Sequence, residues 1–110
     1  MNKYTKLSDF EINKKVAEKL LIPHYVIKDK VLNAGNDSVY DPCNNPADAM
    51  PIIIENGIAI RPYKTATPVA FNAEIGEFYG HTIYNENVLR AAMELFLLIK
   101  DTENENNNNS

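Results

Sequence analysis

The sequence VLRAAMELFLLI runs from Val88 to Ile99 and constrains the architecture more than any other segment. A helix formed here would be apolar on almost every side. Asn87, immediately before it, is a favourable N-cap residue. A helix of this kind is either buried in the middle of a fold or presents a spare face to a partner. The segment therefore predicts a closing helix in one of these two settings.

The chain around this helix is large enough for one domain. It has 110 residues, of which 45% are hydrophobic and 24% are charged, as in an ordinary globular domain. A domain of this size buries roughly two-thirds of the surface of its unfolded chain, so it needs no disulfides or metals to fold. After residue 100 the composition turns acidic and Asn-rich, with nothing to bury. We expect a single domain over residues 1–100 and a disordered acidic, Asn-rich tail over residues 101–110.

A second helix is predicted over residues 9–20. Ser8 and Glu11 have the spacing of a capping box, in which the two residues satisfy each other's backbone donors. Apolar residues then recur at every fourth position, at Ile12, Val16 and Leu20. Pro23 ends the pattern because the residue before a proline is disfavoured in the helical conformation.

The middle of the chain mixes extended segments with one further helix. β-Branched and aromatic residues predict extended segments at residues 24–32, 38–40, 58–60, 69–71 and 78–84. Asn45 and Pro46 are typical of a helix start and Gly57 of a helix end, while Pro51 between them predicts a kink or a restart. The predicted fold class is α+β, a small single domain in which a short antiparallel sheet packs against about three helices.

Cysteine usage and hydropathy indicate the compartment. Cys43 is the only cysteine, which excludes an internal disulfide and is typical of a reducing cytoplasm. Residues 1–10 contain no apolar run of signal-peptide length. No segment approaches the roughly 20 apolar residues that a transmembrane helix needs. We therefore expect a cytoplasmic protein that does not enter a membrane.

The sequence contains no recognised catalytic or cofactor-binding pattern. It has no Walker loop, no dinucleotide-binding glycine motif and no nucleophile elbow. His24 and His81 are isolated and do not make a metal site with Cys43. Either histidine could approach Cys43 in space as a thiol–imidazole pair, although an unreactive, semi-buried cysteine is the commoner arrangement. We expect no enzymatic activity, no cofactor and no bound metal.

Three segments match the pattern of a known family. Residues 40–53 read YDPCNNPADAMPII, residues 89–93 read LRAAM, and residues 7–14 read LSDFEINK. They resemble the central signature YCNNP(A/S)DAWPII, the closing helix and the opening segment of the NinX-like bacteriophage accessory proteins. Met50 stands where the family usually has Trp, Pro42 is inserted, and Val88 stands where Pro is common. The family is a domain of unknown function, so the resemblance implies a phage or prophage origin in a bacterial host and no particular activity.

The signature segment contains polar residues with both structural and functional interpretations. Asn44 and Asp48 could present an amide and a carboxylate to a ligand. The structural interpretation is stronger, because Asp48 lies in a first helical turn, where it complements the helix dipole. Arg90 lies in an apolar helix and needs a partner if it is buried. Asp41 or Asp48 would fill that role and tie the last helix to the signature segment, whereas the functional alternative is contact with an acidic group of a partner.

Charge is divided along the chain. Residues 1–30 carry seven lysines and four carboxylates, a net charge of +3, whereas residues 31–99 carry three basic and eight acidic residues, a net charge of −5. Phosphate backbones require clustered Lys and Arg. Direct binding of nucleic acid is therefore disfavoured, although the lysine-rich first helix leaves it open.

These observations favour stoichiometric protein binding. The leading hypothesis is counter-defence, in which the protein inhibits a host nucleic-acid-targeting complex in the manner of anti-CRISPR proteins. Acidic side chains would occupy a basic channel of that complex, and aromatic side chains would anchor the interface unless they pack in the core. The candidate acidic residues are Asp37, Asp41, Asp48, Glu55, Glu74 and Glu77. The candidate aromatic residues are Tyr40, Tyr63, Phe78, Tyr79 and Tyr84, and Asn44 and Arg90 complete the partner-binding set.

An alternative belongs to a different class. The protein could be an accessory factor in phage replication or recombination that binds nucleic acid or a phage enzyme. Its basic face would consist of Lys3, Lys6, Lys14, Lys15 and Lys19. A homodimer formed through the spare face of the last helix is compatible with either role.

Overall fold

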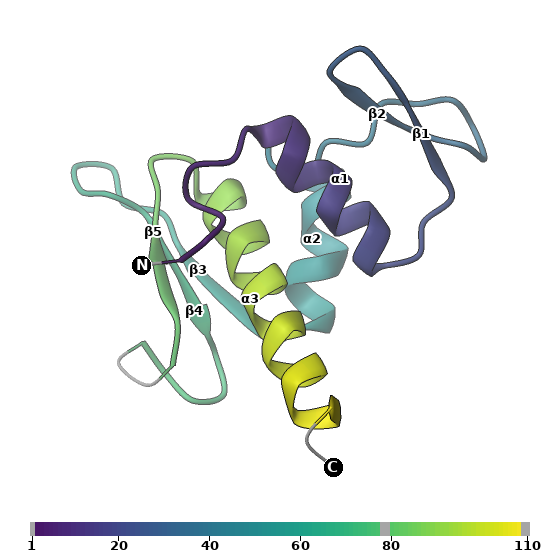
Figure 1. Ribbon diagram of the computed structural model, residues 1–110. Coiled ribbons are helices and arrows are strands. Elements are labelled where there is room, and N and C mark those ends of the chain that lie inside the picture. The colour runs from purple at the N-terminus through teal and green to yellow at the C-terminus, as the bar shows by residue number, and fades with distance from the viewer. Residues whose placement is uncertain (1, 78–79, 109–110) are drawn as a thin grey trace.

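The computed structural model describes the backbone of residues 2–77 and 80–108, and the side chains of these residues up to residue 104. The fold class is α+β, as predicted. Figure 1 shows α3 in the middle of the molecule, with α1 and α2 on one side and a three-stranded sheet on the other. The elements in chain order are α1 (Asp9–Lys19), β1 (His24–Ile27), β2 (Lys30–Asn33), α2 (Pro46–Glu55), β3 (Ile58–Arg61), β4 (Val69–Asn72), β5 (Thr82–Tyr84) and α3 (Val88–Asn108).

The strands form two antiparallel sheets rather than one. β3, β4 and β5 form a sheet in that order, with Ala59 opposite Phe71 and Ala70 opposite Ile83. β1 and β2 form a separate hairpin that projects from the helices in Figure 1. The first two residues of the predicted strand 78–84 lie outside the described residues, and β5 covers only its end.

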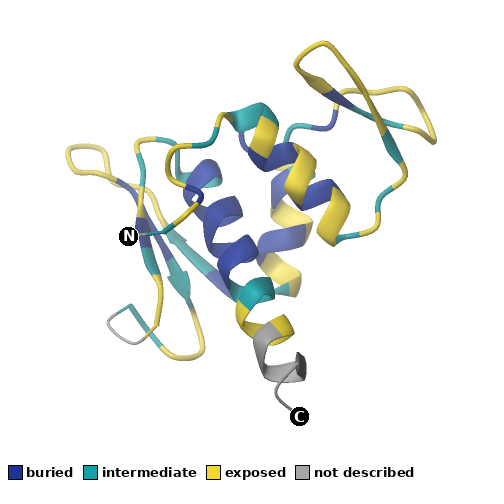
Figure 2. Ribbon diagram, in the orientation of Figure 1, coloured by how far each residue is buried: buried dark blue, intermediate teal, exposed yellow. Residues whose placement is uncertain are grey.

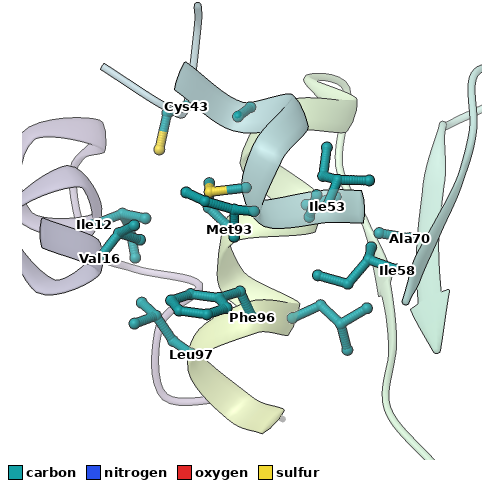
Figure 3. Packing of buried hydrophobic residues seen from close by; sticks show 14 of the residues in the cluster. Ile12, Val16, Cys43, Ile53, Ile58, Ala70, Met93, Phe96 and Leu97 are labelled. Atoms are coloured by element: carbon teal, nitrogen blue, oxygen red, sulfur yellow. The ribbon is translucent and has the colours of Figure 1, made fainter. Parts of the chain in front are cut away.

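Helix α3 is buried in the middle of the fold. Every residue from Arg90 to Leu98 is at most 8% exposed, because α1, α2 and all three strands of the larger sheet contact this helix. Figures 2 and 3 show its buried stretch and the side chains that meet there. The first of the two predicted settings is therefore correct. The spare apolar face on which the homodimer hypothesis depended does not exist between Arg90 and Leu98.

The C-terminal end of the domain differs from the prediction. α3 continues to Asn108, although residues 101–110 were expected to form a disordered tail. Asp101 accepts a hydrogen bond from the hydroxyl of Tyr4 at 2.5 Å and lies 3.2 Å from Nζ of Lys3. The hydroxyl of Thr102 donates to the Leu98 carbonyl at 3.1 Å. The helix extends past residue 100 because the N-terminal segment holds its next turn in place.

The two shorter helices begin where their caps predicted. Ser8 and Glu11 form the reciprocal capping box at the start of α1, and the Asn45 side chain accepts from the Ala47 N–H at the start of α2. The interruption expected at Pro51 does not occur, and α2 runs unbroken through it. Pro51 removes only the hydrogen bond to the carbonyl of Ala47, and that residue lies in an exposed first turn where water can replace the bond.

The region predicted as one strand over residues 24–32 is instead the β1–β2 hairpin. The chain reverses at Lys28 and Asp29, with Lys28 in the left-handed region at a φ of 57°. Val31 is the hairpin's buried contact with the core, and Leu32 forms an isolated bridge with Val39. None of the described helices is long and apolar enough to cross a bilayer.

Candidate functional site

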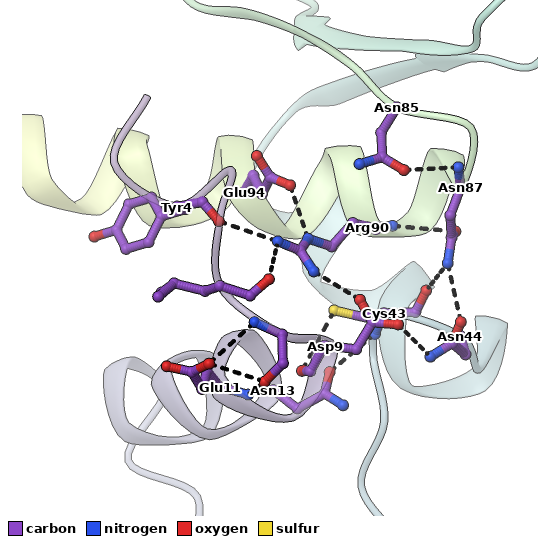
Figure 4. Close-up of polar contacts among 12 residues, drawn as sticks. Tyr4, Asp9, Glu11, Asn13, Cys43, Asn44, Asn85, Asn87, Arg90 and Glu94 are labelled. Carbon is purple, nitrogen blue, oxygen red and sulfur yellow. Dashed lines mark hydrogen bonds and ion pairs between the residues drawn. The ribbon is translucent and has the colours of Figure 1, made fainter. Parts of the chain in front are cut away.

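Arg90 forms the centre of a buried polar network between α3 and the start of the chain (Figure 4). Its side chain is 9% exposed. Nε donates to Glu94 at 2.7 Å, and Nη1 donates to Asp9 at 2.7 Å. Nη2 donates to the carbonyls of Tyr4 at 3.0 Å and Leu7 at 2.7 Å. Arg90 thus clamps the N-terminal segment and the first residue of α1 onto α3.

The predicted partners of Arg90 were wrong. Arg90 pairs with Asp9 and Glu94 instead of Asp41 or Asp48. The reason is topological, because the start of α1 occupies the position next to α3 that the signature segment was expected to fill. The structural interpretation of Arg90 as a clamp is nevertheless the one that the contacts support.

The carboxylates of Asp41 and Asp48 form hydrogen bonds within and beside the signature segment. Asp41 Oδ1 accepts from the amides of Asn13 at 2.8 Å and Asn44 at 3.1 Å. Asp48 accepts the backbone N–H of Asp41 at 2.9 Å. Asn13, which is 6% exposed, also accepts the backbone N–H of Cys43 at 3.0 Å. These carboxylates and amides order the turn before α2, and Asn13, Asp41 and Asn44 also line a groove of about 450 Å³.

Asn87 connects this turn to α3. Its Oδ1 accepts from the N–H groups of Leu89 at 3.0 Å and Arg90 at 3.2 Å, which confirms the predicted cap. Its Nδ2 donates to the Cys43 carbonyl at 2.7 Å and to Oδ1 of Asn44 at 2.9 Å. Sequence reasoning identified the local cap and missed the long-range contacts. The same holds for Asn13, whose helical position gave no sign of burial.

Electrostatics around this network favour its charged state. Burial raises the pKa of the Asp9 carboxyl, but hydrogen bonds from Arg90 and Asn44 outweigh it, so the pKa lies below its ordinary value. Burial also raises the pKa of the Cys43 thiol, and the nearby charge of Asp9 adds to that effect. A thiol in this environment stays protonated and is a poor nucleophile.

The thiol–imidazole hypothesis finds no geometric support at Cys43. The residue is 0% exposed, and its Sγ lies 3.9 Å from the backbone carbonyl of Asp9. His24 instead contacts the Ile22 carbonyl through Nδ1 at 2.7 Å, and His81 lies in an exposed segment before β5. Among the described residues, no group of three or more His, Cys, Asp or Glu side chains could hold a metal ion.

Cys43 in the native protein is expected to react with a thiol-specific disulfide reagent about a thousandfold more slowly than in the denatured protein, because reaction must await opening of the fold. The measurement is the rate of thiolate release in buffer and in denaturant, with free cysteine as the reference. A native rate close to that of free cysteine would mean that the thiol is accessible and would revive the nucleophile hypothesis.

The predicted acidic residues do not form one surface. Asp37 follows β2 and accepts from the Tyr25 hydroxyl at 2.7 Å. Glu77 lies between β4 and β5 and pairs with Arg61 at 2.6 Å. Figure 1 places these two segments at opposite ends of the molecule. Glu55 and Glu74 are exposed, so the prediction that all six carboxylates act together is not supported by their positions.

The predicted aromatic anchors differ in their exposure. Tyr40 is 8% exposed and belongs to the core, and burial together with the Asp48 charge raises its pKa to about 12. Tyr63 and Tyr84 are 42% and 59% exposed. Phe78 and Tyr79 lie outside the described residues.

The basic face predicted for the replication alternative is partly neutralised. Lys3 and Lys19 both lie near Asp101, at 3.2 Å and 3.9 Å. Lys6, Lys14 and Lys15 are exposed. Two of the five predicted lysines thus contact a carboxylate, which weakens the field that this face would present to a phosphate backbone.

A surface that the sequence did not identify lies on the β1–β2 hairpin. Five exposed apolar or aromatic side chains gather on and beside it, and we call them the hairpin patch: Leu21 (85% exposed), Tyr25 (36%), Val26 (41%), Ile27 (52%) and Val39 (50%). Consecutive side chains of a strand point to alternating faces, so Tyr25, Val26 and Ile27 place apolar groups on both faces of the hairpin, whose residues are mostly exposed in Figure 2. The β-branched residues of this segment were the available sequence signal, but they predicted only a strand and not an exposed surface.

Comparison with known proteins gives one match. The family model described as Bacteriophage P22, NinX matches residues 3–100 of the chain. No curated protein and no solved structure matches it.

Proposed function

The chain belongs to the bacteriophage P22 NinX family, and from this premise we propose that it is a phage accessory protein that binds another protein stoichiometrically through the hairpin patch. The observation that carries this proposal is the exposure of Leu21, Tyr25, Val26, Ile27 and Val39 on and beside one projecting element. Single exposed apolar residues are ordinary on protein surfaces, whereas a contiguous group of them is typical of an interaction site.

The marginal stability of an isolated hairpin supports the same proposal. A two-stranded hairpin is marginally stable by itself in water. Val31 anchors this one to the core, while Val26 and Ile27 on the outer strand remain exposed. A partner that covered the hairpin would bury these side chains, and full burial of one Val or Ile contributes roughly 1.5–3 kcal/mol. Binding would therefore stabilise the hairpin and the complex together.

The concrete form that we propose is counter-defence inside an infected or lysogenic bacterium. The protein would inhibit a host nucleic-acid-targeting complex, with the hairpin patch as its main contact. Asp37, Glu55 and Glu74 are the members of the predicted acidic set that are exposed without serving the internal network. They would contribute long-range attraction to a basic host complex more than direct contacts.

The test is co-purification followed by reconstitution. The tagged protein would be expressed in its host during phage challenge, and any protein recovered at near-equal stoichiometry would be purified and titrated with the wild-type chain. We expect a defence nuclease or surveillance complex. Val26→Thr/Ile27→Thr, which keeps β-propensity while adding hydroxyls to the hairpin patch, should weaken binding at least about tenfold.

The matched control is Ile54→Thr. Ile54 is 72% exposed on α2 and lies outside the hairpin patch, so this change should leave binding unaltered. Equal binding by the wild type and the hairpin variant would exclude the hairpin as the contact. Recovery of phage replication proteins or DNA in place of a defence complex would refute counter-defence and favour the replication alternative, with Lys6, Lys14 and Lys15 as the next residues to change.

A further inference from the structure

A groove lies along the outer edge of β5. It has a volume of about 740 Å³, within the range of sites that hold ligands. β5 forms one wall, and the N-terminal segment and one side of α3 form the others. Its lining includes Asn2, Thr82, Tyr84, Asn85, Glu94 and Leu98.

The backbone of β5 has hydrogen-bonding groups directed into this groove. The Asn85 N–H donates to the Pro68 carbonyl at 3.1 Å, which sets the phase of the β4–β5 ladder. Antiparallel neighbours alternate between hydrogen-bonded and non-hydrogen-bonded pairs. Ile83 therefore directs its N–H and C=O toward Ala70 of β4, whereas Thr82 and Tyr84 direct theirs to the opposite edge. No other strand in the described residues pairs with that edge.

The charged groups of the groove already have partners. Glu94 is 1% exposed and accepts from Arg90 at 2.7 Å and from the Asn2 amide at 2.9 Å. Asp101 is close to Lys3. A charged side chain brought into the groove would lose water without gaining an opposite charge. The remaining lining includes amides, hydroxyls, the His81 imidazole and the apolar side chains of Ile83 and Leu98, which suits uncharged residues.

We propose that this groove binds an extended, uncharged peptide segment of a partner protein, which pairs with the main chain of Thr82 and Tyr84 as a fourth strand of the sheet. Strand addition of this kind derives its affinity from main-chain hydrogen bonds and its selectivity from alternate side chains. Side chains on the inner face of the added strand would meet Leu98 and the Asn2 amide. This site is separate from the hairpin patch and does not depend on the function proposed above.

A single extended segment fits the groove better than the edge of a second copy. The N-terminal segment and α3 wall the side opposite β5, and in Figure 1 the start of the chain lies beside β5. A folded partner would need an open approach to the strand edge. A flexible segment can enter between these walls.

The test uses the full chain labelled with ¹⁵N and the blocked peptide acetyl-Thr-Val-Thr-Val-Thr-amide as the probe. We expect the amide resonances of Thr82 and Tyr84 to shift on titration in the millimolar range. A control peptide with N-methyl groups on alternate residues should bind about tenfold more weakly, because it loses at least one main-chain hydrogen bond. Equal binding by both peptides, or no shift at Thr82 and Tyr84, would overturn the proposal.

Hydrogen exchange of the protein alone provides a second test that needs no ligand. The amides of Thr82 and Tyr84 should exchange fast, whereas the amide of Ile83, paired with β4, should be protected. Protection of all three would mean that the edge is already covered and would overturn the proposal. Tyr84→Pro removes one outward N–H and should abolish the shift on peptide addition, and an unchanged far-ultraviolet spectrum of that variant would show that its fold is intact.

Discussion

Replacing Arg90 with Met should lower the free energy of unfolding by about 3–5 kcal/mol, the range expected when one partner of a buried ion pair is removed. Met fills part of the same volume but leaves the 1% exposed Glu94 carboxylate without its cation. It also leaves the carbonyls of Tyr4 and Leu7 without their donor. Urea denaturation monitored by circular dichroism measures the change through the shift in midpoint at constant slope.

Two controls separate the buried charge from the loss of an arginine as such. Arg61 also pairs with a carboxylate, Glu77, at 2.6 Å, but its side chain is 45% exposed, so Arg61→Met should change stability far less. The double variant Arg90→Met/Glu94→Gln removes the orphaned charge and should be more stable than Arg90→Met alone. A loss below about 1 kcal/mol for Arg90→Met would show that the clamp contributes little.

Phe96→Ala should also lower the free energy of unfolding by about 3–5 kcal/mol. Phe96 is 0% exposed, and in Figure 3 its ring lies between α1 and Ile58 of β3. Removing the ring opens a cavity between the two sides of the fold, and α3 cannot move to close it without losing its contacts on the other side. Thermal and urea denaturation measure the loss.

The matched control for Phe96 is Ile54→Ala, at an apolar side chain that is 72% exposed. Its effect should stay within about 0.5 kcal/mol because it removes no buried surface. A Phe96→Ala variant as stable as the wild type would contradict the central position of α3. Together with the Arg90 variants, these measurements distinguish the apolar from the polar half of the contact between α3 and α1.

The polar network explains much of the family signature without assigning it an activity. Asn44 donates to Asp9, and Asn87 donates to Asn44, so the turn before α2 connects the first residue of α1 with the cap of α3. Asp41 and Asn13 complete the connection. A segment that connects three helices in this way has a structural role, and the interaction surface that we propose lies elsewhere, on the hairpin.

Local sequence signals predicted the helix starts correctly, because each of them acts within about one helical turn. Ser8 with Glu11, Asn45 with Pro46, and Asn87 satisfy backbone donors two or three residues away, so no knowledge of the fold was needed to place them. The sequence also limited α3 to two settings, since a helix apolar on nearly every side is either buried or faces a partner, and the structure shows the buried one. The α+β class followed from the order of these elements.

The partners of Arg90, the exposure of the hairpin and the groove along β5 were decided by tertiary structure alone. Arg90 and Asp9 are 81 positions apart in the sequence. The residues of the hairpin have the same sequence pattern as a strand that packs one face on a core. The physical reason is that periodicity reports which side of an element is apolar, but not which neighbour covers it. Long-range pairing depends on how all the helices and strands pack together. The surfaces on which function depends are therefore visible only in the assembled fold.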